Sequence, residues 1–154
     1  MTGEAARFAV RLEKALRLED PQTFRDYFGK INDLARRVRG YLDGELKKGE
    51  RVFGLGASTK GNVLLQLFGI TKDMMPFISE RNTDKVGLRT LGTDFELISE
   101  ERARDLKPST MLVLPWYFKK EIVERERGYL EQGGKLLFPM PYAHVVTGEG
   151  EIKL

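Results

Sequence analysis

A glycine-rich turn between a short apolar run and a helical pattern carries the residues of this sequence best suited to bind a ligand. Residues 51–62 read R-V-F-G-L-G-A-S-T-K-G-N, and V-L-L-Q-L-F follows. Glycine can adopt positive φ and has no Cβ, so amides at the start of the helix can approach a phosphate or a ribose. The order predicts a binding turn made of Gly54, Gly56, Ala57, Ser58, Lys60, Gly61 and Asn62.

The spacing of these glycines differs from both standard nucleotide-binding motifs. Gly54, Gly56 and Gly61 form G-x-G-x-x-x-x-G, which is longer than the dinucleotide fingerprint. A P-loop ends in Gly-Lys-Ser/Thr, whereas Lys60 here precedes Gly61. The pattern disfavours nucleoside triphosphate hydrolysis, and the glycines would equally serve a tight turn packed against a neighbouring strand.

Four more candidate residues follow the apolar runs downstream. Glu80 stands near where a dinucleotide-binding fold places a carboxylate on the ribose hydroxyls, although an ion pair with Arg81 or Lys85 is the more common use of such an acid. Trp116 could stack on a base or a sugar, or be a half-buried core ring. Tyr117 could donate a hydrogen bond to a ligand or anchor its loop.

The composition is that of an ordinary globular chain. Of 154 residues, 41% are hydrophobic and 32% charged, and 26 basic against 23 acidic residues leave a net charge of +3. This mild, mixed charge does not indicate nucleic-acid binding. The absence of cysteine and the single His144 exclude disulfides and disfavour a metal site. With no signal-like N-terminus and no long apolar run, we expect a cytoplasmic protein without membrane contact.

Hydrophobic periodicity changes near residue 49. Residues 5–18 and 21–47 have helical spacing, so we expect residues 1–48 to form a connector helix and a helix that covers a sheet. Residues 49–154 alternate short apolar runs with helices, which predicts a Rossmann-like α/β domain with a mostly parallel sheet and flanking helices. The expected strands are 51–55, 76–79, 95–98, 110–114 and 135–139, and the expected helices are 61–68, 99–105 and 118–131.

In such a sheet, ligands bind at the carboxyl ends of the strands where the strand order reverses. The turn at 54–62 and the segments 80–82, 115–117 and 139–142 should meet there. The mixed charges of the helix at 118–131 suit a solvated surface without a functional role, and His144 is expected to be structural.

Several segments in order resemble one enzyme family. They are G-L-G-A-S-T-K-G-N-V-L-L (54–65), E-R-N-T-D-K-V-G (80–87), L-G-T (91–93), L-P-W-Y (114–117), E-I (121–122) and G-G-K-L-L-F-P-M-P (133–141). Together they look like the C-terminal domain of sugar C-methyltransferases, which use S-adenosylmethionine to methylate a carbon of nucleotide-linked ketosugars. The resemblance runs from about residue 24 to residue 146.

The resemblance implies a three-part enzyme with a zinc-binding piece, a central catalytic domain and a C-terminal Rossmann-like domain that helps to hold the nucleotide-sugar. This chain resembles only the last part. It would therefore bind substrate through the turn, Glu80, Arg81, Trp116 and Tyr117, would bind no cofactor by itself, and would be inactive without a catalytic domain in cis or in trans.

Some positions depart from the family pattern near the expected crevice. Glu80 replaces the usual aspartate, Thr83 and Leu91 stand where prolines are usual, and Tyr117 stands where asparagine is common.

Two alternative functions also remain open. One is an independent nucleotide- or NAD-binding module that uses Glu80 on a ribose, and the other is a degenerate domain whose apolar helix stripe serves assembly.

Overall fold

The computed structural model describes residues 3–154, which form two compact units. The first unit ends at Asp33 and the second is Leu34–Leu154. The elements are α1 (Gly3–Ala15), α2 (Pro21–Lys47), β1 (Val52–Leu55), α3 (Thr59–Phe68), β2 (Phe77–Glu80), η1 (Thr83–Lys85), β3 (Glu96–Ser99), α4 (Glu100–Asp105), β4 (Thr110–Val113), η2 (Trp116–Phe118), α5 (Lys119–Arg125), α6 (Arg127–Glu131), β5 (Lys135–Phe138), β6 (His144–Thr147) and β7 (Gly150–Lys153).

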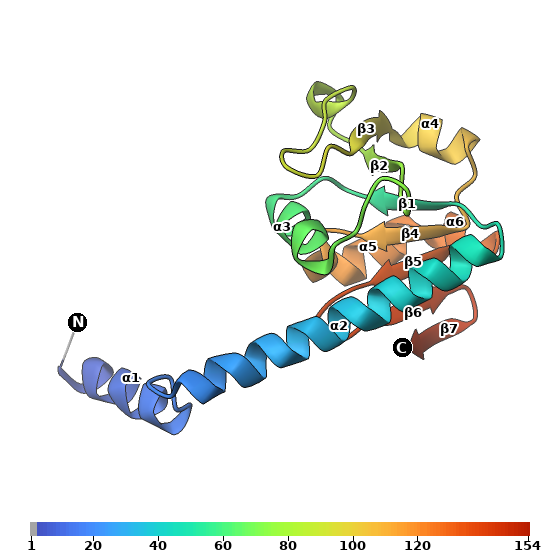
Figure 1. The fold of residues 1–154 in the computed structure, drawn as a ribbon. Coiled ribbons are helices and arrows are strands. Elements are labelled where there is room, and N and C mark those ends of the chain that lie inside the picture. Colours follow the sequence, from blue (N-terminus) through green and yellow to red (C-terminus); the bar gives the residue numbers. More distant parts are fainter. Residues whose placement is uncertain (1–2) are drawn as a thin grey trace. The chain divides into compact units, whose positions relative to one another are not determined.

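The second unit is built on a seven-stranded sheet of order β3-β2-β1-β4-β5-β6-β7 (Figure 1). The first five strands of this order are parallel, and β6 and β7 are antiparallel to their neighbours. This confirms the predicted α/β fold with a mostly parallel sheet. The antiparallel hairpin β6–β7 was not predicted.

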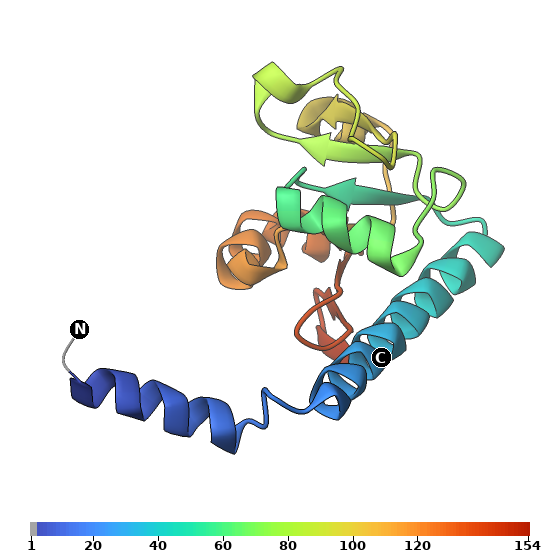
Figure 2. The same ribbon diagram turned by 60° about the vertical axis from the view of Figure 1, so that its left-hand side comes forward.

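Helices cover both faces of the sheet (Figure 1 and Figure 2). On one face, α5 and α6 press Ile122 and Leu130 onto Met111 and Val113 of β4. On the other face, α3 approaches Leu114 through Gly61, and the C-terminal half of α2 supplies the fully buried Val38 and Leu42. Parallel strands buried on both faces explain why these strands read as continuous apolar runs.

Capping residues fix where the helices begin and end. Ser58 accepts a hydrogen bond from the Gly61 amide at the start of α3, and Gly69 ends that helix in the left-handed conformation. Ser99 caps α4 in the same way through the Arg102 amide. Such caps satisfy backbone groups that have no partner within the helix.

The helix predicted over residues 118–131 is instead two helices that meet at Glu126. This carboxylate is buried and is bound by Arg104 of α4 and by Arg125. The prediction of a uniformly solvated surface was therefore wrong at Glu126, because its charge is satisfied by paired arginines rather than by water.

A buried carboxylate also anchors α2 to the sheet. Glu45 is 1% exposed, and its carboxylate accepts hydrogen bonds from Lys135 Nζ at 2.5 Å and Lys48 Nζ at 2.8 Å. The Thr110 hydroxyl lies 3.3 Å from the same carboxylate. Burial acts to raise the pKa of Glu45, but the hydrogen bonds from the two lysines outweigh it and hold the pKa below its usual value.

None of the helices described within residues 3–154 is long and apolar enough to span a membrane.

Candidate functional site

The crevice predicted from the strand order lies between the carboxyl ends of β1 and β4. Here the chain leaves β1 toward one side of the sheet and β4 toward the other, which is where open α/β sheets bind ligands. Gly56 follows β1 with φ +76°, and a Cβ at this position would lie 3.0 Å from the ring of Pro115. The turn therefore requires glycine both for its backbone conformation and for this close approach.

Glu80 organises the crevice from the end of β2. Its side chain is buried, and its two carboxylate oxygens accept hydrogen bonds from the Ala57 amide at 2.8 Å and the Asn82 amide at 2.9 Å. The Lys85 ammonium donates to the Ala57 carbonyl at 3.2 Å. Glu80 thus ties the glycine turn to the loop after β2, a role that the sequence did not indicate. Within residues 3–154 it forms no ion pair with Arg81 or Lys85.

The first turn of α3 faces this crevice. Ser58 satisfies the Gly61 amide, whereas the amides of Thr59 and Lys60 precede the first intrahelical hydrogen bond. The ammonium of Lys60 lies 4.7 Å from the centre of the Tyr117 ring. Free amides, the helix dipole and a lysine together favour an anion at this point.

A pocket of about 410 Å³ opens beside this turn. Among the predicted site residues, those that line it are Gly56, Ala57, Ser58, Glu80, Arg81 and Tyr117. The lining residues that were not predicted are Leu55, Glu100, Pro115, Phe118, Glu121, Ile122 and Arg125. The volume is in the range of small-molecule sites.

Some of the charged side chains that line the pocket are already held in ion pairs. Arg125 pairs with Glu100 at 3.2 Å, which joins α4 to α5 across the pocket wall. Arg81 is exposed, and across residues 3–154 its guanidinium has no hydrogen-bond or ion-pair partner. It is therefore available to a ligand anion.

The remaining predicted residues do not line the pocket: Lys60 lies over the ring of Tyr117, and the other four have packing roles. Gly54 lies in β1, where a Cβ would come 2.8 Å from Ile78, and a Cβ on Gly61 would come 2.5 Å from Leu114. Asn62 binds the Leu91 carbonyl at 3.0 Å and so holds the 91–93 loop on α3. Trp116 is half-buried against the core, so Tyr117 and Phe118 provide the exposed rings.

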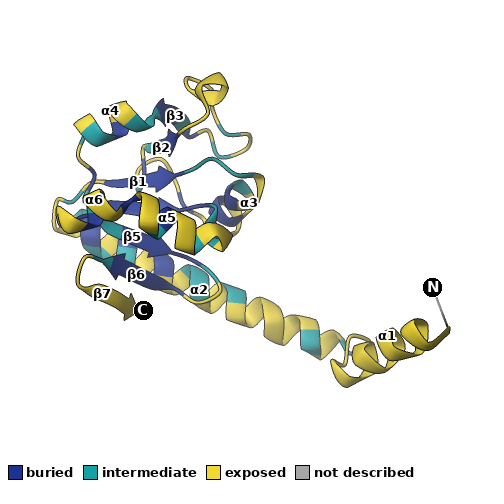
Figure 3. Ribbon diagram, turned by 180° about the vertical axis from the view of Figure 1, so that it is seen from behind, coloured by how far each residue is buried: buried dark blue, intermediate teal, exposed yellow. Residues whose placement is uncertain are grey.

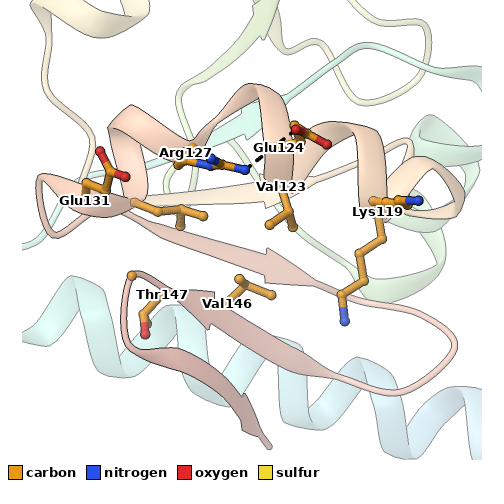
Figure 4. Close-up of a pocket in the computed structure, with 10 residues that line it drawn as sticks. Lys119, Val123, Glu124, Arg127, Glu131, Val146 and Thr147 are labelled. Atoms are coloured by element: carbon orange, nitrogen blue, oxygen red, sulfur yellow. Dashed lines mark ion pairs between the residues drawn. The ribbon is translucent and has the colours of Figure 1, made fainter.

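A second, larger pocket of about 730 Å³ lies away from this crevice. It is bounded by α5, α6 and β6 and contains no predicted site residue (Figure 4). Val123 and Val146 line its apolar part, and Arg127 is 3.6 Å from Glu124 at its rim. Its rim charges have mixed signs, and no arrangement in it favours one ligand class.

His144 is buried in β6 next to the aromatic rings of Phe138 and Tyr142. Its Nδ1 lies 2.8 Å from the Tyr142 carbonyl oxygen, which can only accept, so Nδ1 carries the proton. Within residues 3–154 no group of three or more His, Cys, Asp or Glu side chains is placed to bind a metal ion.

Comparison with known proteins identifies the family. The sequence profile of the C-methyltransferase C-terminal domain matches residues 2–141. The chain belongs to this family. A curated relative, the C-methyltransferase NovU of Streptomyces niveus, is 29% identical over 129 residues, which cover 84% of this chain and 31% of NovU. The chain therefore spans about a third of the length of this relative.

The extent of the match shows which parts belong to the family domain. The matched range of this C-methyltransferase C-terminal domain contains α1, α2 and every residue that lines the crevice. It ends before β6 and β7, so the hairpin that extends the sheet lies outside it.

Proposed function

We propose that this domain holds the nucleotide-sugar substrate of an S-adenosylmethionine-dependent C-methyltransferase, and that it works with a catalytic methyltransferase domain in cis or in trans. The observation that carries the proposal is the pocket at the strand switch point, which is lined by the N-cap Ser58 of α3 and by the exposed Arg81 in a domain of this family. A nucleotide-sugar carries a diphosphate, which is the anion that such a place suits.

Different residues of the site would contact the different chemical groups of the ligand. Arg81 lines the pocket and would contact the diphosphate. The amides of Thr59 and Lys60 and the Lys60 ammonium, which lies over the Tyr117 ring beside the pocket, would reach the same group. The exposed rings of Tyr117 and Phe118 would pack against the base or the sugar. Trp116 would support these rings from beneath, as its edge-to-face contact with Tyr117 suggests.

We place S-adenosylmethionine, the methyl donor, outside this chain. In our proposal the catalytic domain binds this cofactor, and Glu80 has no assigned ligand contact because it holds the Ala57 and Asn82 amides. The domain would bind and orient substrate, and it would transfer no methyl group by itself.

Replacement of Arg81 by alanine tests the anion contact. We expect about tenfold weaker binding of thymidine diphosphate glucose, measured by isothermal titration calorimetry, because one charge-assisted hydrogen bond is lost. Arg127→Ala removes another exposed arginine, at the other pocket, and should leave the affinity unchanged. Equal affinities of the wild-type chain and Arg81→Ala would remove Arg81 from the site.

A further inference from the structure

The pocket beside the glycine turn is lined by two groups of residues that differ in charge. The first group comes from the ends of β1 and β2 and the start of α3, and its charge without a partner in residues 3–154 is the cation of Arg81. The second group comes from α4 and α5 and contains Glu100, Glu121, Ile122 and Arg125. The two groups therefore offer different surroundings to the two ends of an elongated ligand.

Glu121 carries the free carboxylate of the second group. It is an exposed residue of α5, a helix with much of its surface open to solvent on the side seen in Figure 3. Within residues 3–154 its side chain has no hydrogen-bond or ion-pair partner. Arg125 lies one turn further along the helix, at the spacing that permits a pair with Glu121. Its guanidinium instead contacts Glu100 at 3.2 Å and Glu126 at 2.9 Å.

The neighbouring charges leave that of Glu121 without compensation. Arg125 is shared between Glu100 and the buried Glu126, which also pairs with Arg104. In the pocket lining, α4 and α5 therefore contribute two carboxylates and one guanidinium. This part of the pocket carries a net negative charge, in contrast to the part that contains Arg81.

A carboxylate at this position distinguishes between ligand groups by their charge. A carboxylate accepts hydrogen bonds and donates none, so it suits the several hydroxyl groups of a sugar better than a pyrimidine base, which offers a single N–H. It repels a second carboxylate, and the repulsion is strong where no cation is free to offset it. An unpaired charge in a binding site is a recognised means of rejecting the wrong ligand.

We infer that Glu121 makes this pocket select nucleotide-sugars whose sugar is uncharged over those whose sugar carries a carboxylate, as in a uronic acid. The diphosphate lies toward Arg81, and the hydroxyl groups of the sugar lie toward Glu121. This inference rests on the proposed function, because it requires a nucleotide-sugar in the pocket, and it adds the class of sugar that the pocket accepts.

The test compares two ligands that differ only at C6 of the sugar, thymidine diphosphate glucose and thymidine diphosphate glucuronate, by calorimetric titration at neutral pH. We expect the wild-type chain to bind the glucose compound at least roughly tenfold more tightly. Glu121→Gln should reduce this ratio to about threefold or less, mainly through tighter binding of the glucuronate compound. A gain in affinity is not a result that damage to the fold would produce.

Glu124→Gln is the matched control, because it removes the same charge from the same helix. Glu124 lines the other pocket, where it is 3.6 Å from Arg127, and this variant should keep the wild-type ratio. Equal affinities of the wild type for the two ligands, or an unchanged ratio in Glu121→Gln, would overturn the inference while binding of the glucose compound still supports the proposed function. Failure of the wild type to bind the glucose compound would contradict both.

Discussion

Replacement of Glu45 by alanine is expected to lower the free energy of unfolding by about 3 kcal/mol, because it breaks a buried ion pair. The carboxylate is 2% exposed and anchors α2 through Lys135, whose side chain is 29% exposed. Without Glu45, the partly buried ammonium of Lys135 has lost its counter-charge, and the Thr110 hydroxyl has lost its acceptor. Urea unfolding followed by circular dichroism measures the change.

The control for this prediction is Asp43→Ala, on the same helix. Asp43 is exposed, and substitutions of that kind usually change stability by less than about 0.5 kcal/mol. A loss as small for Glu45→Ala would show that the pair contributes nothing net.

The Glu45 pair also predicts a pH dependence with a definite sign. The pKa of Glu45 is lower in the folded protein than in the unfolded chain, where it is about 4.3. Its stabilisation is therefore complete above that value and is lost as the pH falls through the folded pKa. The stability difference between the wild type and Glu45→Ala should shrink on acidification from neutral to about pH 3.

Glu80→Ala should loosen the crevice and weaken nucleotide-sugar binding by at least roughly tenfold, with a loss of about 2 kcal/mol of stability. The substitution leaves the amides of Ala57 and Asn82 without their acceptor. Because Ala57 belongs to the turn that opens α3, its displacement would move the Thr59 and Lys60 amides that we propose bind the anion. Calorimetric titration with thymidine diphosphate glucose gives the affinity, and thermal unfolding gives the stability.

Glu80→Gln separates charge from hydrogen bonding. Its amide oxygen can accept from one backbone amide, but its NH₂ group would face the other, so we expect an intermediate effect. Glu101→Ala, which removes an exposed carboxylate of α4, should behave as the wild type does. Full affinity in Glu80→Ala would contradict the role of Glu80 in shaping the crevice.

The sequence predicted the parallel part of the fold because buried strands and helix caps are local signals. The runs that became β1, β4 and β5 are apolar and bounded by turns or helical patterns. The hairpin was missed because β7 is exposed at every residue and has no buried face to impose an alternating pattern. The break at Glu126 was missed because its partner Arg104 is 22 residues away in the sequence.

The site was predictable in position but not in the division of roles among its residues. Strand order alone places the glycine turn and the segment after β2 at one edge. Whether a glycine meets a ligand or a neighbouring side chain depends on tertiary distances, such as that from Gly61 to Leu114. Likewise, the sequence left Trp116 open between stacking on a ligand and half-burial in the core, and tertiary packing places it against the core and leaves Tyr117 exposed.

The most direct test of the central claim is a thermal-shift screen of the purified chain. The ligands are thymidine and uridine diphosphate sugars, their free nucleotides, NAD and S-adenosylmethionine. A ligand that binds only the native state, at roughly tenfold above its Kd, should raise the melting temperature by about 4 °C. We predict this rise with the nucleotide-sugars and no rise with NAD or S-adenosylmethionine. A rise with NAD alone, or none with any nucleotide-sugar, would contradict the assignment of the crevice to substrate binding.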